Sequence, residues 1–369
     1  MLIHTIESRF FRNLASQTLN PGPRFNVLCG DNAQGKTNFL ESIYLVACLR
    51  SFRAHRSREL LRFGEREAVV RAAVQAGGMR RELEVRLQEG GRHARVDGKG
   101  VRSSAGYLSR GLNVVLFTPD DVQVPRGSPA QRRQLLDRAI ANLWPAYTGL
   151  HRDYHKTLQS RNRVLRDGGR ESLIDVYGDQ LCEQGARLVL ARQRYLTAVA
   201  PRMQQVFDEI SHSGVVASLH HVTQPSVLEA TLGNQEQVRQ AMRAVMRQQL
   251  ATDRARQSTS VGPHADDLDF RLDGRSARQV GSQGQHRALL LSFKVAQIVD
   301  THQRVGEYPV LLLDDVSSEL DAQRNGYLFD FINKIPCQAF LTTTRVELLP
   351  MGDDRNDFQV VDGVVRAAN

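Results

Sequence analysis

The segment GDNAQGKT, residues 30–37, decides how this chain folds. It matches the pattern GxxxxGK[ST], whose glycines let the backbone turn tightly enough for its N–H groups to face phosphate oxygens. The apolar run Phe25–Cys29 precedes it and predicts a buried strand, and Lys36–Cys48 has apolar residues at helical spacing. A strand, a glycine-rich loop and a helix therefore follow in the order that a phosphate-binding loop requires, which disfavours a chance glycine turn.

The last two residues of this loop have different expected roles. Lys36 is expected to reach the β- and γ-phosphates of ATP, and the hydroxyl of Thr37 to bind Mg²⁺. The helix that begins near Lys36 points its positive end at the same phosphates. The residues expected to contact the nucleotide are Gly30, Asp31, Asn32, Ala33, Gln34, Gly35, Lys36, Thr37 and Asn38.

An acidic pair follows a wholly apolar run far along the chain. Val310–Leu313 predicts a short strand inside a parallel sheet, and Asp314 and Asp315 come directly after it. Asp314 is placed to hold Mg²⁺ through water, and Asp315 to polarise an attacking water. Two acids at a strand end are common by chance, but together with Lys36 they predict an ATP-hydrolysing site.

A polar helix start lies shortly before the acidic pair. The segment Gly281–Gln285 reads GSQGQ and precedes a predicted helix at Gly284–Val299. A serine hydroxyl, a flexible glycine and a helix N-terminus together form an anion site. Ser282, Gln283 and Gly284 are therefore further candidate nucleotide contacts. Alone, such a helix start would be weak evidence, because polar helix starts are common.

Length and patterning predict two structural units. The chain has 369 residues, 41% of them apolar, enough to bury a sizeable core. Three strand-like stretches between residues 67 and 97 are separated by glycine pairs, whereas the middle of the chain is helical. The predicted parts are 1–122 and 259–369, which form one α/β head, and a mainly helical insertion at 123–258. Within that insertion, helices are expected at 129–143, 145–166, 173–210 and 235–255.

Composition narrows the possible partners and compartments. The formal net charge of +9 is typical of proteins with an anionic partner such as nucleic acid. A basic protein that binds no anionic partner is an equal alternative. The four cysteines form no CxxC pair, which disfavours a zinc site or a disulfide framework. No apolar run approaches the roughly 18 residues of a membrane span, and no signal peptide is apparent. A cytoplasmic protein without a membrane partner is expected.

Taken together, the motifs resemble the RecF family of bacterial recombination and gap-repair ATPases. The resemblance spans nearly the whole chain. It rests on NAQGKTNFLESI (Asn32–Ile43), LRSFRAHR (Leu49–Arg56), FTPDD (Phe117–Asp121), GSPAQRRQLLD (Gly127–Asp137), GPHADDL (Gly262–Leu268), GSQGQHRALLLSFKVA (Gly281–Ala296) and LLLDDVSSELD (Leu311–Asp321).

The resemblance implies an α/β fold, namely an ABC-type P-loop ATPase head (Rad50/SMC-like) with an inserted helical arm domain. It implies an ATP-dependent homodimer in which Ser282 completes the site of the opposite subunit and Asp321 lies at the interface. It further implies DNA binding in DNA replication, DNA damage repair and the SOS response, helping to load recombinase on single-stranded gaps with RecO and RecR. Slow Mg²⁺-dependent hydrolysis is expected, because Asp315 is one methylene shorter than the glutamate of many ABC ATPases. His286 and Arg345 depart from the family pattern and put interface contacts in doubt.

Several residues are candidates for other contacts. Arg53, Arg56, Arg132 and Arg133 are candidate DNA contacts, because guanidinium groups suit phosphates; the basic segment that contains the first two also includes His55. For each arginine a solvated surface is an equal alternative, and some could bind nucleotide or a second subunit. Contacts to adenine and ribose are expected near Arg12 and Asn13. His264, Asp266 and Asp267 could hold a metal ion, but a structural role is favoured. An ABC transporter subunit and an ATP-binding scaffold are the competing functions.

Overall fold

The computed structural model describes residues 1–54, 56–346, 349–351 and 354–368, so the candidate His55 lies outside the described chain. Contacts divide the chain into two compact units. Unit 1 comprises Met1–Gln123 and Leu290–Asn369, and unit 2 comprises Val124–Leu289. The long helix α10, Gln283–Val305, contributes residues to both.

Unit 1 contains an antiparallel sheet in the order β2-β1-β4-β5-β6-β7. The turn between β4 and β5 consists of Gly77 and Gly78, with φ values of 58° and 72°. A two-residue hairpin turn of this type needs positive φ at both positions, which glycine adopts without steric cost. The strands are β1 (Leu2–Arg9), β2 (Gln17–Leu19), β4 (Glu67–Ala76), β5 (Met79–Gln88), β6 (Gly91–Val96) and β7 (Lys99–Gly100).

The second sheet of unit 1 has the order β15-β14-β3-β13-β12-β8. Every neighbouring pair is parallel except β14 and β15, which form a hairpin at the edge. The strands β3, β13, β12 and β8 carry almost only buried side chains, as expected for a parallel sheet covered on both faces. The strands are β3 (Phe25–Cys29), β8 (Val114–Phe117), β12 (Val310–Asp314), β13 (Ala339–Thr343), β14 (Arg355–Val361) and β15 (Val364–Ala367).

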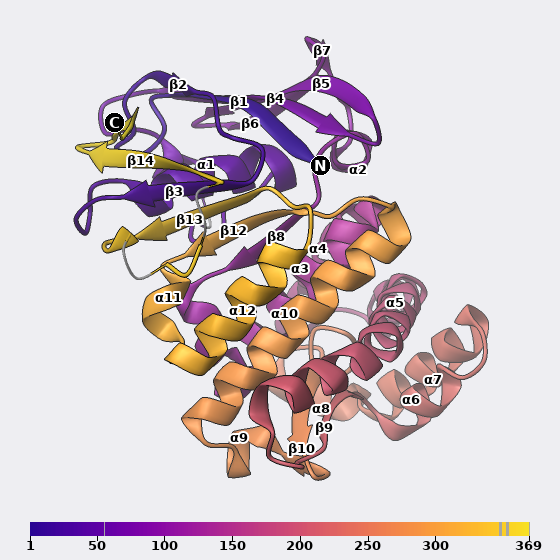
Figure 1. The fold of residues 1–369 in the computed structure, drawn as a ribbon. Helices are drawn as coiled ribbons and strands as arrows, with labels where there is room; N and C mark the ends of the chain where they lie inside the picture. The colour runs from indigo at the N-terminus through magenta and orange to yellow at the C-terminus, as the bar shows by residue number, and fades with distance from the viewer. Residues whose placement is uncertain (55, 347–348, 352–353, 369) are drawn as a thin grey trace. The chain divides into compact units, whose positions relative to one another are not determined.

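Helix α1 (Lys36–Cys48) lies between the two sheets of unit 1 (Figure 1). Every residue from Phe39 to Cys48 is buried, and strands of both sheets pack around the helix in one hydrophobic core. Figure 1 shows α12 and α10 on the opposite face of the parallel sheet. The other unit 1 elements are the 3₁₀ turn η1 (Ser57–Leu60), α2 (Ser104–Leu108), α11 (Val316–Glu319) and α12 (Ala322–Lys334), and η2 (Pro119–Arg126) runs across the unit boundary.

Unit 2 is mainly helical. Its first helix begins at the predicted residue 129. Ser128 caps α3 through Gln131, and Pro129 occupies the first helical position. The predicted helix at 235–255 is wrong as one element, because the chain breaks at Gln249 into two helices. The helices are α3 (Pro129–Leu143), α4 (Pro145–Arg166), α5 (Glu171–Ser211), α6 (Pro225–Ala230), α7 (Gln235–Gln248), α8 (Leu250–Arg256) and α9 (Ala277–Val280).

A small antiparallel sheet, in the order β11-β10-β9, moves the unit boundary from where the sequence placed it. The strand β10 (Asp267–Leu272) pairs along its whole length with β9 (Ala217–Val222), and β11 (Arg275–Ser276) completes the sheet. This pairing between distant strands joins residues 259–289 to unit 2, whereas the sequence assigned them to the head. The boundary predicted after residue 122 lies after Gln123, one residue later.

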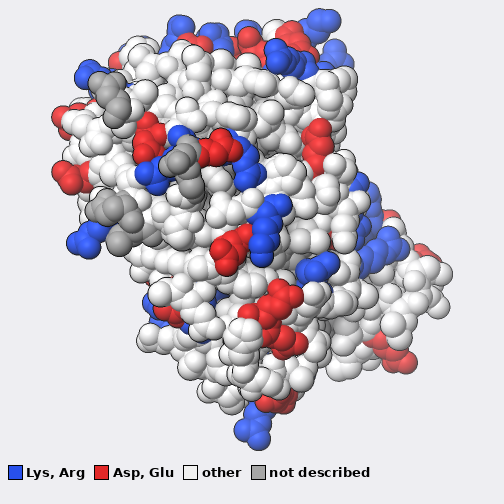
Figure 2. Space-filling view, viewed as in Figure 1, with Lys and Arg blue, Asp and Glu red and all other residues white. Residues whose placement is uncertain are grey.

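Charge is mixed over the surface that Figure 2 presents. Basic and acidic side chains alternate there in small groups, so the net charge of +9 does not gather in one basic area on this face. No helix in the described part of the chain is long and apolar enough to cross a membrane.

Candidate functional site

The parallel sheet brings four strand ends to one edge. In register, Leu313 of β12 pairs with Phe117 of β8, Asp314 with Thr342 of β13, and Thr343 with Cys29 of β3. Because parallel strands share one direction, the residues that follow each of them meet at the same edge, where open α/β sheets bind their ligands. The glycine-rich loop after β3 and the acidic pair after β12 therefore face one location.

The glycine-rich loop curls around the N-terminus of α1. Gly35 has a φ of 113°, and a Cβ there would lie 3.0 Å from the Asn13 side-chain oxygen, so only glycine fits. Ala33 also has a left-handed φ of 66°. The Lys36 Nζ donates to the carbonyl oxygens of Gly30 (2.5 Å) and Asp31 (2.8 Å), which holds the ammonium group over the loop.

Two threonines hold the carboxylate of Asp314. The hydroxyls of Thr37 and Thr342 donate to its Oδ1 at 2.8 and 2.9 Å. Burial raises the pKa of Asp314 above the usual carboxyl value, and these two hydrogen bonds act in the opposite direction. The Thr342 hydroxyl also accepts the backbone N–H of Asp315 at 2.9 Å. Thr342 thus joins both members of the acidic pair.

A pocket of about 420 Å³ opens at this edge of the sheet, within the usual size range of small-ligand sites. It brings together most of the predicted nucleotide contacts with both acids. Of the predicted loop residues, Gly30, Asp31 and Gln34 are not in its lining. The lining residues are Asn32, Ala33, Gly35, Lys36, Thr37, Asn38, Arg53, Pro119, Asp314, Asp315 and Thr342.

The C-terminal hairpin supports the loop from behind. The side-chain oxygen of Gln34 accepts the N–H of Asp362 at 2.7 Å, and its carbonyl accepts the N–H of Gly363 at 2.8 Å. A Cβ at Gly30 would lie 2.3 Å from the Val360 carbonyl oxygen. Gln34 is therefore a structural anchor of the loop in this conformation.

Arg53 lines the pocket, although the sequence suggested a DNA contact. Its Nη1 donates to the Asn38 side-chain oxygen at 3.1 Å, and the Asn38 amide donates to Asn13 at 2.7 Å. Asn13 thus lies beside the glycine-rich loop, near where adenine and ribose contacts were expected. The Arg53 side chain is exposed and carries the second positive charge of the pocket.

The polar helix start is capped as a reciprocal pair. The Ser282 hydroxyl accepts the N–H of Gln285 at 3.1 Å, and the Gln285 side chain accepts the N–H of Ser282 at 2.9 Å. Ser282 and Gln283 are exposed, and Gly284 is half-buried. His286, a departure from the family pattern, is buried and its Nε2 donates to the carbonyl of Ala277 at 2.8 Å. Its role is structural, since this bond fixes the preceding turn.

Asp321, the predicted interface residue, caps a helix. Its carboxylate accepts the N–H of Arg324 at 3.0 Å at the start of α12 and also pairs with the Arg324 guanidinium. Asp315 precedes the short helix α11 with a left-handed φ of 48°. The segment 317–321 therefore connects the acidic strand end to α12.

The structure corrects the assignment of Arg132 as a DNA contact. Arg132 is 3% exposed, and its guanidinium binds both carboxylate oxygens of Asp267. Arg133 is half-buried and donates to the Asp266 carbonyl at 2.6 Å. Arg132 cannot reach a phosphate without breaking its ion pair with Asp267. Arg56 is exposed.

His264 also has a structural role. Its Nδ1 accepts the Tyr154 hydroxyl at 2.7 Å, and its Nε2 donates to the Thr259 carbonyl at 2.9 Å. Burial lowers the pKa of this imidazole, which favours the neutral form that these two bonds require. Within the described residues, no group of three or more histidine, cysteine, aspartate or glutamate side chains is placed to hold a metal ion.

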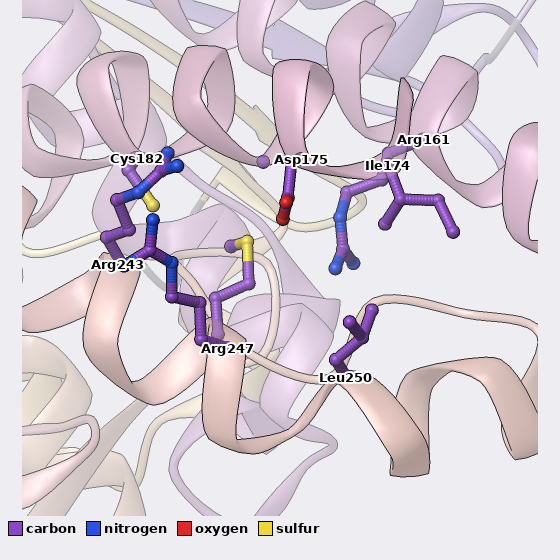
Figure 3. Close-up of a pocket in the computed structure, with 9 residues that line it drawn as sticks. Arg161, Ile174, Asp175, Cys182, Arg243, Arg247 and Leu250 are labelled. Atoms are coloured by element: carbon purple, nitrogen blue, oxygen red, sulfur yellow. The ribbon is translucent and has the colours of Figure 1, made fainter. Parts of the chain in front are cut away.

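Two hollows in unit 2 do not suit a nucleotide. One lies between α5 and α7 and measures about 10 Å³, room for a single water. Figure 3 shows Arg161 and Asp175 directed into it, and the Arg161 Nη1 is held by Asp253 at 2.7 Å. The other measures about 530 Å³ but has no lysine or arginine in its lining. Neither is lined by a glycine-rich loop like that of the unit 1 pocket.

Sequence reasoning missed Thr342 and Pro119 as pocket residues. Thr342 lies in a buried strand whose end shares an edge with Asp314, so the strand pattern could have indicated it once the strand order was known. Pro119 follows β8 at the same edge. The order of strands in a sheet is a tertiary feature, which the periodicity of one strand does not encode.

Known proteins match this chain over nearly its whole length. Residues 2–363 match the family described as the RecF/RecN/SMC N terminal domain. A "DNA replication and repair protein RecF" from Anaeromyxobacter sp. (strain Fw109-5) is 41% identical over 357 residues, covering 96% of each chain. Its namesake from Geobacter sulfurreducens (strain ATCC 51573 / DSM 12127 / PCA) is 38% identical over 367 residues, covering 99% of each chain.

Solved structures agree with this assignment. One described as "Structure of the recombination mediator protein RecF-ATPrS in RecFOR pathway" is 31% identical and superposes with a TM-score of 0.90, covering 100% of this chain and 98% of that one. An Smc head bound to part of ScpA is 16% identical with a TM-score of 0.57, covering 100% and 97%, which shows the fold alone. The glycine-rich loop, the acidic strand end and the parallel sheet that joins them are thus those of an ABC/SMC-like P-loop ATPase, and the chain belongs to the RecF family.

Proposed function

We propose that this protein is an ATP-dependent DNA-binding protein of recombinational and gap repair, and that MgATP binds in the unit 1 pocket. The observation that carries this proposal is the convergence of the Lys36 loop and Asp314 on one pocket of about 420 Å³. The backbone N–H groups of the loop and the ammonium of Lys36 suit the β- and γ-phosphates. A RecF solved with an ATP analogue, whose fold this chain shares, supports the same ligand.

The donor set fits Mg²⁺. The Thr37 hydroxyl and the Asp314 carboxylate oxygen are 2.8 Å apart. Hydroxyl and carboxylate oxygens are ligands that Mg²⁺ prefers, so Thr37 and, through water, Asp314 would hold the ion. Such an ion would neutralise phosphate charge during phosphoryl transfer. Asp315, whose N–H is fixed by Thr342, is proposed to polarise the attacking water, with slow turnover because its side chain is short.

We infer that ATP draws two copies of the chain together. Ser282 and Gln283 are exposed at the start of α10, where N–H groups and a hydroxyl can bind the phosphates of a nucleotide held by the other copy. Asp321 is proposed to lie at the same interface. In this arrangement each subunit supplies the loop for one nucleotide and Ser282 for the other.

The proposed partner of the dimer is DNA at single-stranded gaps. The net charge of +9 and the RecF relatives support a phosphate-rich partner. Arg56 is exposed and is not in the lining of the pocket, so it remains a predicted DNA contact, whereas Arg53, also exposed, is reassigned to the nucleotide. The name of a solved RecF places that protein in the RecFOR pathway, which supports RecO and RecR as mediators that act with this cytoplasmic protein to load recombinase.

The test compares the wild-type chain with Lys36→Ala, using exposed Lys99→Ala as the control. Loss of the ammonium should lower MgATP affinity about 100-fold, because charge-assisted hydrogen bonds to phosphate are lost. ATP-dependent binding to gapped DNA should disappear in Lys36→Ala and remain in Lys99→Ala. Equal DNA binding with and without ATP in the wild type would refute the proposal. An ATP-bound dimer that never hydrolyses ATP, with or without gapped DNA, would favour a scaffold instead.

A further inference from the structure

A fully buried carboxylate lies on the helix that carries the glycine-rich loop, and the proposed ATP chemistry does not use it. Glu41 is in the middle of α1 and is 0% exposed. The Arg12 guanidinium binds it through two hydrogen bonds, Nε to Oε2 at 2.9 Å and Nη2 to Oε1 at 3.0 Å. A buried charge requires such a partner, so this pair by itself explains only why Glu41 is tolerated.

Ser51 connects this buried pair to the segment that follows α1. Its hydroxyl donates to the Glu41 Oε1, which fixes the direction of the hydroxyl proton. The Ser51 hydroxyl oxygen in turn accepts two backbone N–H groups, from Arg53 at 2.8 Å and from Ala54 at 2.7 Å. One hydroxyl therefore uses its donor and both lone pairs, and it sets the backbone of residues 51–54.

Arg53 is the residue that this turn presents to the pocket. Its side chain is exposed, yet its Nη1 is directed to Asn38 at 3.1 Å, beside Lys36 and Thr37 in the pocket lining. A long side chain on a free loop loses conformational entropy when it binds a phosphate. A turn held from the buried side of α1 removes the backbone part of that loss before the nucleotide arrives.

We propose that Glu41 and Ser51 are positioning residues, which hold the 51–54 turn so that Arg53 binds the phosphates of the nucleotide. The inference rests on the proposed function, because it concerns the same pocket. It differs from a purely structural account of the Arg12–Glu41 pair, which predicts a loss of stability and no specific link to Arg53. The two accounts are separated by asking whether the effect of Ser51 depends on the Arg53 side chain.

The experiment is a double-mutant cycle in the full chain. MgATP dissociation constants are measured for wild type, Ser51→Ala, Arg53→Ala and the double variant. We expect Ser51→Ala to weaken binding about tenfold when Arg53 is present and by less than about twofold when it is absent. Ser51→Thr keeps the hydroxyl and should restore most of the affinity. Ser109→Ala removes an exposed unit 1 hydroxyl that donates to the Gly106 carbonyl at 3.3 Å, and it should leave binding unchanged.

A second variant changes Glu41, the buried partner of Ser51. Glu41→Gln keeps an oxygen that can accept from Ser51 but removes the charge that Arg12 requires, so it should lower stability while keeping the dependence on Arg53. Equal weakening by Ser51→Ala with and without the Arg53 side chain, or no weakening at all, overturns the positioning role. Failure of the wild-type chain to bind MgATP would instead overturn the proposed function, so the two failures are distinguishable.

Discussion

Thr342→Val tests how much the acidic strand end depends on one hydroxyl. Valine has nearly the same shape but removes the donor to Asp314 and the acceptor for the Asp315 N–H, both at 2.9 Å. Thr342 is 3% exposed and Asp314 is 6% exposed, so water replaces the lost partners poorly. A hydrogen bond to a charged group contributes about 1.5–3 kcal/mol, and an orphaned N–H costs about 1–3 kcal/mol. Because Asp315 is half-buried, its N–H falls at the low end, and we expect a total loss of about 2–4 kcal/mol.

The loss is measured by urea unfolding, following the transition that MgATP shifts, since only the unit that binds the ligand is stabilised by it. The same variant should weaken ATP binding in the presence of Mg²⁺ more than in its absence, because the oriented carboxylate serves the ion. Thr343→Val is the matched control. Its hydroxyl donates to the Arg345 carbonyl at 3.1 Å and accepts the Arg345 N–H at 3.0 Å, so the Mg²⁺-dependent part of ATP affinity should persist. A stability loss below 1 kcal/mol in Thr342→Val, with unchanged Mg²⁺ dependence, would refute this reasoning.

Three further outcomes are expected. Asp137→Ala should lower the free energy of unfolding by about 3–5 kcal/mol, because Arg192 is 2% exposed and loses carboxylate contacts of 2.9 and 3.0 Å. In urea unfolding, the double variant Asp137→Leu with Arg192→Met should recover most of this free energy. An Asp137→Ala variant as stable as the wild type contradicts the role of the pair. Burial lowers the pKa of His155 to about 4, below the unfolded value of about 6.5, so the folded state binds fewer protons and stability should fall as the pH drops through this window. His155→Gln should flatten that pH dependence in thermal unfolding, and an unchanged slope argues against it. Ser282→Ala should bind MgATP as a monomer and fail to dimerise in sedimentation measurements. If this variant dimerises with ATP as the wild type does, the shared site is excluded.

Local signals in the sequence predicted many elements accurately. The bounds of β3, α1, α3 and α4 match the predictions, because glycines, prolines and a serine cap mark where each begins or ends. Other elements were missed: β1, β9 and the C-terminal hairpin of β14 and β15, although Asp362-Gly363 is a typical hairpin turn. Their stability comes from pairing with distant strands, such as β14 with β3, rather than from their own residues.

The sequence by itself determined the phosphate-binding loop and the acidic pair, because binding phosphate and Mg²⁺ demands particular residue types at short, fixed spacings. Only the tertiary structure decided what surrounds them. The order of the parallel strands brought Thr342 to Asp314, and the turn after α1 brought Arg53 into the pocket. In unit 2, β10 pairs with β9, and Asp267 at the start of β10 binds the buried guanidinium of Arg132. This contact removed Arg132 from the candidate DNA contacts. Contacts between residues far apart in sequence depend on strand order and register, which no local pattern specifies.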